Sequence, residues 1–193
     1  MNERQTYVGP MMEPVKDLCW YKPREVVESE YCEKYSEFIH VGDDYFIGMN
    51  TDESAFIAGM LRNRRPRKVL EVGFNKGGTT LVLLEALKSL ESNAEVYSVD
   101  LNDGAPGKKL FNNISKDFTN LTFWTGRDVS AYLDEIGGDI DFCILDSAHF
   151  LPGELLNFLC VLPYLKTDAM VIVHDQVHQF DVDVPYVKFL GSE

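Results

Sequence analysis

The chain has 193 residues, of which 45% are hydrophobic and 25% are charged, a length and composition typical of one globular domain. Its formal net charge of −13 argues against a nucleic-acid or anionic-membrane partner, because phosphate groups would be repelled. No apolar run approaches the roughly 20 residues that span a membrane, and no signal peptide is visible. The four cysteines form no CxxC pair. We therefore expect a cytoplasmic protein with reduced, buried thiols.

Residues 1–50 are predicted to form an N-terminal helical extension, followed by a ligand-binding domain over residues 51–193. A helix is expected over residues 51–64, with acidic residues in its first turn and arginines in its last. The basic run RNRRPRK at 62–68 suits the negative end of that helix dipole, and an anion-binding patch is the alternative.

Beyond residue 67, short apolar runs alternate with helical patterns. The predicted strands are 68–73, 95–100, 121–126, 140–146 and 169–175. The helical patterns between them lie at about 78–91, 107–118, 129–135 and 152–164. Strands that alternate with helices in this way predict an α/β fold with a doubly wound, mainly parallel, Rossmann-like sheet.

Four of the five predicted strands carry a carboxylate at or near their carboxyl end. These residues are Glu71, Asp100, Asp146 and Asp175. Ligands of open parallel sheets bind beyond that edge, so the pattern predicts a site there. Helix capping by short polar side chains is the alternative explanation for one or two of them.

The stretch VLEVGFNKGGTTLVLLEAL, residues 69–87, places a glycine turn between the first strand and the next helix. A dinucleotide fingerprint fails because Asn75 stands where G-x-G-x-x-G needs glycine, and a P-loop fails because Thr79 replaces its lysine. The remaining pattern is E-x-G-x-x-x-G, formed by Glu71, Gly73 and Gly77.

That pattern resembles motif I of the class I S-adenosylmethionine-dependent methyltransferases, in which the acid ending the second strand, here Asp100, binds the ribose. The resemblance implies a cofactor site made of Glu71, Gly73, Asn75, Gly77, Gly78, Thr79, Thr80, Asp100, Leu101, Arg127 and Asp128. The family's sheet closes with an antiparallel pair, for which the 18 residues after Asp175 are too few. We expect a short or truncated C-terminal edge, or one that a partner completes.

Residues 142–177 are similar to the metal-dependent O-methyltransferases of the catechol type and of the bacterial sugar and macrolide type. This resemblance implies a Mg²⁺ or Mn²⁺ site made of Asp146, Asp175 and Gln176, with His149 as the catalytic base. Oxygen donors suit these hard ions, and a neutral imidazole can accept a hydroxyl proton. Packing or capping is the alternative for His149 and for His174.

The predicted function is therefore an S-adenosylmethionine-dependent O-methyltransferase that acts on a hydroxyl of a sugar or small metabolite. Two alternatives stay open at this point. The first is a nicotinamide-dependent oxidoreductase on a similar sheet, and the second is a domain that binds the cofactor or a partner without turnover. Homo-oligomerisation is also open.

Overall fold

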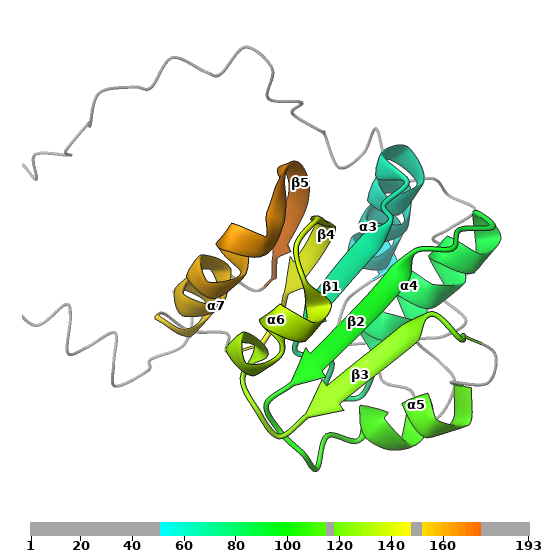
Figure 1. The fold of residues 1–193 in the computed structure, drawn as a ribbon. Helices are drawn as coiled ribbons and strands as arrows, with labels where there is room; N and C mark the ends of the chain where they lie inside the picture. Colours follow the sequence, from blue (N-terminus) through cyan, green and yellow to red (C-terminus); the bar gives the residue numbers. More distant parts are fainter. Residues whose placement is uncertain (1–50, 115–117, 148–151, 175–193) are drawn as a thin grey trace, which may run out of the picture.

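The computed structural model describes residues 51–114, 118–147 and 152–174. These residues form one five-stranded sheet with helices on both faces (Figure 1). The elements are α3 (Thr51–Arg64), β1 (Lys68–Val72), α4 (Gly78–Ser89), β2 (Glu95–Asp100), α5 (Gly107–Ile114), β3 (Leu121–Thr125), η1 (Val129–Ala131), α6 (Leu133–Ile136), β4 (Ile140–Leu145), α7 (Gly153–Val161), η2 (Leu162–Tyr164) and β5 (Leu165–Val173).

The strands lie in the order β3-β2-β1-β4-β5, and all neighbouring pairs are parallel. The chain changes direction across the sheet between β1 and β4, which is the topological switch point where ligands of such sheets bind. The predicted α/β fold with a doubly wound parallel sheet is confirmed, whereas the predicted short C-terminal edge lies outside the described residues. The predicted N-terminal extension, residues 1–50, lies outside the described residues.

Three predicted elements differ in detail from those observed. The helix expected over 129–135 is two short pieces, η1 and α6, and the helix expected over 152–164 ends as the 3₁₀ turn η2, which carries Pro163. β5 begins at Leu165, where Lys166 forms an ion pair with Asp141 on the neighbouring strand. The pairing of β4 with β5 shifts register between Ile140 and Phe142, which accommodates this earlier start.

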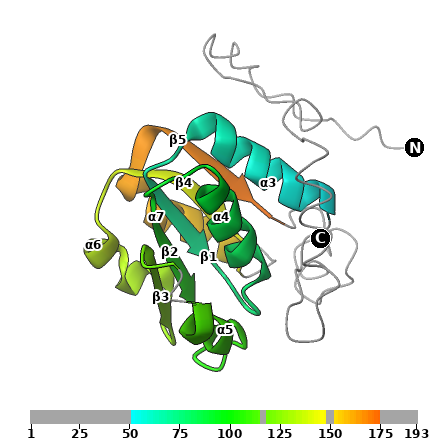
Figure 2. The ribbon, with the colours of Figure 1, turned by 90° about the vertical axis from the view of Figure 1, so that its right-hand side faces the viewer.

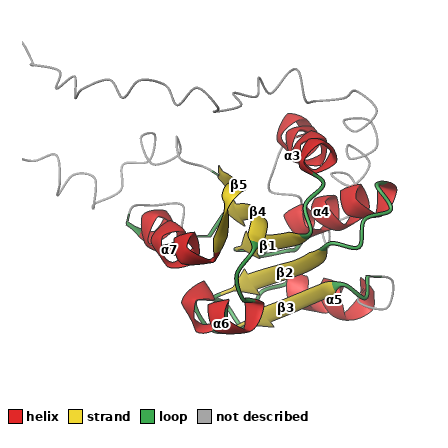
Figure 3. Ribbon diagram, turned by 45° about the horizontal axis from the view of Figure 1, so that its top comes forward, coloured by secondary structure: helices red, strands yellow, loops and turns green. Residues whose placement is uncertain are grey.

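The hydrophobic core lies in two layers, one on each face of the sheet. Figure 3 shows α3, α4 and α5 on one side and α6 and α7 on the other, and Figure 2 shows α3 and α4 side by side. Side chains alternate between the faces along each strand. On β1, Val69 packs in the layer under α3 and α4, whereas Leu70 and Val72 pack under α6 and α7. Glu71 therefore points into the first layer.

Two of the four cysteines lie within the described residues. Cys143 is fully buried on β4, and burial raises the pKa of its thiol to about 12. Cys160 is also a free thiol. None of the helices in the described ranges has the length and apolar character needed to cross a membrane.

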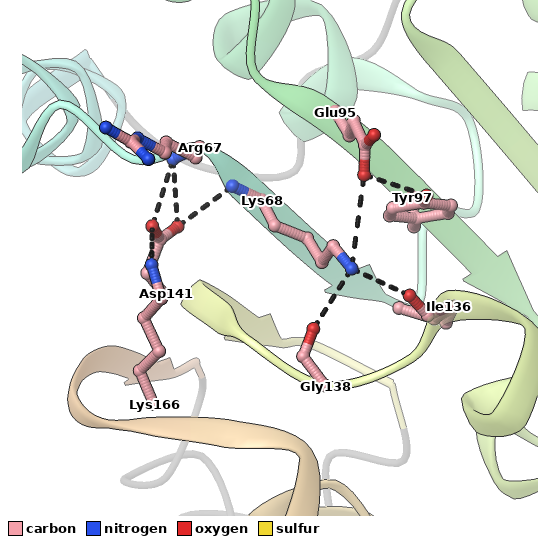
Figure 4. Close-up of polar contacts among 8 residues, drawn as sticks. All are labelled: Arg67, Lys68, Glu95, Tyr97, Ile136, Gly138, Asp141 and Lys166. Atoms are coloured by element: carbon pink, nitrogen blue, oxygen red, sulfur yellow. Dashed lines mark hydrogen bonds and ion pairs between the residues drawn. The ribbon is translucent and has the colours of Figure 1, made fainter.

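The amino edge of the sheet is held together by Asp141 on β4. Its carboxylate accepts hydrogen bonds from the backbone N–H groups of Arg67 and Lys68, all at 3.0 Å (Figure 4). The Lys166 ammonium group completes the set at 3.1 Å. One acid thus ties the starts of β1, β4 and β5 together.

The Lys68 ammonium group forms a second set of contacts between elements at the same edge. It donates to the carbonyl oxygens of Ile136 at 2.9 Å and Gly138 at 3.0 Å, and it lies 4.0 Å from the Glu95 carboxylate (Figure 4). Glu95 in turn accepts a hydrogen bond from the Tyr97 hydroxyl at 3.1 Å. The loop after α6 is therefore anchored to β1 and β2.

The basic run at the end of α3 also serves the fold. The Arg64 guanidinium donates to the carbonyl oxygen of Asp168 at 2.7 Å, and that of Arg65 donates to the carbonyl oxygen of Leu90 at 3.1 Å. These contacts agree with the interpretation of the run as a helix end. They connect α3 to β5 and to the end of α4.

Candidate functional site

A pocket of about 280 Å³ opens at the carboxyl edge of the sheet. It lies between the ends of β1 and β2, the η1 turn and the start of α7. Its lining residues are Val72, Gly73, Val99, Asp100, Leu101, Asp128, Val129, Ser147, Gly153, Leu156 and Asn157. Four of the predicted cofactor residues, Gly73, Asp100, Leu101 and Asp128, are thereby brought together from three separate loops.

Gly73 lets the end of β1 pass directly against the end of β4. Its φ is +91°, and a Cβ at this position would lie 2.1 Å from the carbonyl oxygen of Asp146. Gly77 has φ 85° in the left-handed region and caps the N-terminus of α4. Between them, Asn75 also has a positive φ of 42°. The turn needs glycine at Gly73 both for its conformation and for space.

Asp100 holds this turn in place. One carboxylate oxygen accepts hydrogen bonds from the backbone N–H groups of Phe74 at 3.1 Å and Asn75 at 2.8 Å. The other accepts from the backbone N–H of Asn102 at 2.8 Å. An ionised carboxylate has about four acceptor positions, so about one remains for a ligand in the pocket that Asp100 lines.

Glu71 lies beneath the turn in the core rather than in the pocket wall, with 0% of its surface exposed. Its Oε2 accepts hydrogen bonds from the Thr80 hydroxyl at 2.5 Å and the Ser98 hydroxyl at 2.6 Å, whereas no described residue bonds its Oε1. The pKa of Glu71 is raised to about 7, mainly by burial; the two hydroxyl hydrogen bonds lower it, and the nearby charges of Asp146 and Asp100 raise it. The predicted motif I acid is thus partly protonated near neutral pH.

Some of the other predicted cofactor residues line the pocket, and the rest lie outside its lining. Leu101 is 69% exposed at the pocket rim. Asp128 lines the pocket and caps η1 by accepting a hydrogen bond from the backbone N–H of Ser130 at 3.0 Å. Seven predicted residues are not among the lining residues, namely Glu71, Asn75, Gly77, Gly78, Thr79, Thr80 and Arg127. Gly78, Thr79 and Thr80 are buried at the start of α4.

Asp146, the predicted metal ligand after β4, lies beside the end of β1, because its backbone N–H donates to the carbonyl oxygen of Val72 at 2.9 Å. Its Oδ1 lies 3.0 Å from Nδ1 of His174, and Nε2 of His174 lies 3.7 Å from Oε2 of Glu53 on α3. The His174 ring is thus packed between two carboxylates, in agreement with the packing alternative.

The remaining predicted catalytic and metal residues, His149, Asp175 and Gln176, lie outside the described residues. Their roles stay predictions. Within residues 51–114, 118–147 and 152–174, no three His, Cys, Asp or Glu side chains are grouped so as to hold a metal ion. Of the proposed ligands, Asp146 alone falls within these ranges, with 15% of its side chain exposed.

Sequence reasoning missed the wall that α7 contributes. Glu154 and Asn157 are 2% and 8% exposed, and both contact Ser147 at the end of β4. The signal was one amide and one acid in the otherwise apolar helix GELLNFLCV, on the side that turns inward. Charge and glycine patterns do not reveal this wall.

The sequence was compared with protein families and with curated proteins. The family described as "Methyltransferase domain" matches residues 70–176, from within β1 to just beyond the last described residue, His174. A comparison with curated proteins finds no match.

Solved structures share the fold at low sequence identity. The O-methyltransferase TomG of Streptomyces achromogenes, solved with S-adenosylmethionine, is 18% identical, with a TM-score of 0.59 over 87% of this chain and 80% of that one. The methyltransferase PaMTH1 of Podospora anserina, bound to S-adenosylhomocysteine, is 17% identical, with a TM-score of 0.56 over 76% and 67%. An O-methyltransferase of Thermotoga maritima is 22% identical, with a TM-score of 0.51 over 67% and 47%.

Proposed function

The chain belongs to the methyltransferase family, and from that premise we propose that it transfers a methyl group from S-adenosylmethionine to a hydroxyl oxygen of a sugar or small metabolite. The family match covers more than half of the chain and confirms the predicted enzyme class, a transferase. It also removes the nicotinamide-dependent alternative. The observation that carries the proposal is the pocket in which the glycine turn, the acid ending β2 and the η1 turn meet.

The pocket suits the nucleoside part of this cofactor. Its volume of about 280 Å³ is close to the lower end of the roughly 300–1,000 Å³ found for small-molecule sites. Asp100 offers its remaining acceptor position to a ribose hydroxyl, and Leu101 at the rim offers apolar surface to a ring. The carboxylates of Asp100 and Asp146 at the ends of β2 and β4 favour the positive charge of a sulfonium.

The proposed reaction is an in-line displacement. The acceptor oxygen forms a bond to the methyl carbon while the carbon–sulfur bond breaks, and sulfur keeps the electron pair as S-adenosylhomocysteine. The hydroxyl proton goes to His149, which stands two residues after Ser147 in the sequence. Catalysis of this kind depends mainly on holding the two reactants in line. The turn after β1, which Asp100 fixes through two backbone N–H groups, would help to position the cofactor.

We further propose that a divalent ion, Mg²⁺ or Mn²⁺, assists the transfer. Asp146, Asp175 and Gln176 would hold it, and their oxygen donors suit such an ion. The backbone N–H of His174 donates to the carbonyl oxygen of Leu145 at 2.9 Å, so the chain reaches residue 174 beside the end of β4. When bound, the ion would lower the pKa of the acceptor hydroxyl.

The test is methyl transfer from labelled S-adenosylmethionine to a panel of catechols, sugars and small hydroxylated metabolites. We expect transfer to oxygen, loss of activity after EDTA treatment and its recovery with Mg²⁺. His149→Ala should lower the rate by about 10²–10⁴-fold with little change in cofactor affinity. Cofactor binding without transfer to any hydroxyl would contradict the proposal and favour the non-catalytic alternative. A rate that EDTA leaves untouched would remove the metal alone.

A further inference from the structure

One polar side chain of the pocket wall uses only part of its hydrogen-bonding capacity within the fold. α7 presents an apolar surface, and Asn157 is the amide on its inward side, 8% exposed and lining the pocket. Across the pocket stands the η1 turn, against which α7 packs, with Asp128 as its cap. An amide carries both a donor and an acceptor, and a polar atom in a largely buried side chain is destabilising when it has no partner.

The neighbours of Asn157 fix which way its amide points. Buried Glu154 accepts a hydrogen bond from the backbone N–H of Ser147 at 2.8 Å and a longer one from its hydroxyl at 3.3 Å. Because the Ser147 hydroxyl donates to Glu154, its lone pairs face Asn157. The Asn157 amide nitrogen donates to that oxygen at 2.6 Å. If the amide were flipped, Oδ1 of Asn157 would face the Ser147 oxygen and two acceptors would meet. Oδ1 is therefore the amide atom that does not contact Ser147.

That Oδ1 atom has no hydrogen-bond donor among the described residues, and it is not one of the fully buried unpartnered atoms. It therefore reaches the space that Asn157 lines. The walls around that space are largely apolar, with Val72, Val99, Val129 and Leu156 among them. An apolar slot with an accessible acceptor fits a flat heterocycle that carries a donor on its edge.

We propose that Asn157 is a specificity-determining residue of this site: its Oδ1 accepts a hydrogen bond from the exocyclic amine of the cofactor's adenine. The inference rests on the proposed function, because it takes the ligand to be S-adenosylmethionine. The ribose hydroxyls are assigned to Asp100 on β2, and we assign the base to the wall that α7 forms. A hypoxanthine base would present a carbonyl oxygen to Oδ1, and two facing acceptors repel.

The experiment measures the affinity of S-adenosylhomocysteine and of its deaminated analogue, S-inosylhomocysteine, by calorimetry. We expect the wild-type chain to prefer the adenine compound by roughly 5- to 150-fold, the scale of leaving a buried acceptor unpaired. Asn157→Leu should reduce that preference to within about threefold, mainly by weakening the adenine compound. Asn157→Ala is the second variant, since alanine is the best helix former and removes the same acceptor.

Asn93→Leu, on the exposed loop at the opposite edge of the sheet, is the matched control and should keep the wild-type preference. A purely structural role for Asn157 would weaken both ligands equally and leave their ratio unchanged. If both Asn157 variants keep the wild-type ratio, the assignment of Asn157 is wrong while the proposed function stands. If the wild-type chain binds neither compound, the proposed function fails, and this inference fails with it.

Discussion

The two edges of the sheet use the same residue types in opposite ways. At the amino edge, Asp141 is surrounded by backbone N–H groups and the Lys166 ammonium group, so acid and base neutralise each other. At the carboxyl edge, Asp100 and Glu71 are held by backbone amides and hydroxyls, and within the described ranges neither is paired with a lysine or arginine. Among the described residues, Asp141 is thus paired with a basic side chain, whereas Asp100 and Glu71 are not.

The difference separates groups that complete the fold from groups that remain available. At the amino edge, the side chains of Asp141, Lys68 and Lys166 each form hydrogen bonds within the chain. At the carboxyl edge, Glu71 Oε1 is buried without one, and Asn157 Oδ1 faces the pocket. Since buried polar groups in native proteins are nearly always satisfied, the exceptions point to a ligand or to a protonation change.

The largest difference between the two edges is expected when a glycine at each edge is replaced by alanine. Gly73→Ala would place a Cβ 2.1 Å from the carbonyl oxygen of Asp146 at a positive φ, so we expect the free energy of unfolding to fall by roughly 3–5 kcal/mol. Gly138→Ala at the amino edge is the control, because no atom lies within 4 Å of its added Cβ, and it should change stability by about 0.5 kcal/mol or less. Urea unfolding measures both. Equal effects would contradict the close approach of β1 to β4.

A second test uses pH. Burial raises the pKa of Glu71 from 4.5 to about 7, so the folded chain holds this proton where the unfolded chain releases it. The stability this provides is fully present below about pH 4.5 and is lost as the pH rises through about 7, a loss of about 3 kcal/mol. Glu71→Gln should remove this slope between pH 5 and 8. Glu135→Gln on the exposed surface should leave it, and an unchanged slope in Glu71→Gln would disprove the assignment.

The smallest effect is expected at the amino edge. Lys166→Met removes the ion pair with Asp141, whose carboxylate keeps its backbone hydrogen bonds to Arg67 and Lys68. We expect the free energy of unfolding to fall by less than about 1 kcal/mol, because partly exposed ion pairs contribute little. The affinity for S-adenosylhomocysteine should not change. A large loss of affinity would show that the two edges are not separate in function.

The fold was largely predictable because local patterns determine it. The runs that became the central strands β1 and β4 are buried on both faces, so they read as nearly continuous apolar strands, and β2 and β3 follow the same spacing toward the edge of the sheet. The break at Tyr132, which splits η1 from α6, was missed because a single turn carries no periodic signal. The early start of β5 depends on the Lys166 ion pair with Asp141, a contact between distant residues.

The candidate site was predictable in part. Gly73 and Asp100 follow from glycine spacing and from an acid at a strand end. The burial of Glu71 follows from the alternation of side chains along β1, which places every second one under α4. Its place as an acid within the glycine motif instead predicted that Glu71 lies in the cofactor site. The wall formed by Ser147, Glu154 and Asn157 depends on the packing of α7 against the sheet, which no local motif encodes.

The central claim is that the carboxyl edge binds the cofactor and the amino edge only stabilises the fold. Asp100 and Asp141 test it as a matched pair, since each carboxylate accepts three hydrogen bonds from backbone N–H groups. We would measure S-adenosylhomocysteine binding by calorimetry for Asp100→Asn and Asp141→Asn, with urea unfolding of each. Both variants should lose stability, but only Asp100→Asn should lose affinity, by roughly 1–3 kcal/mol. Wild-type affinity in a folded Asp100→Asn variant, or an equal loss in Asp141→Asn, would contradict the claim.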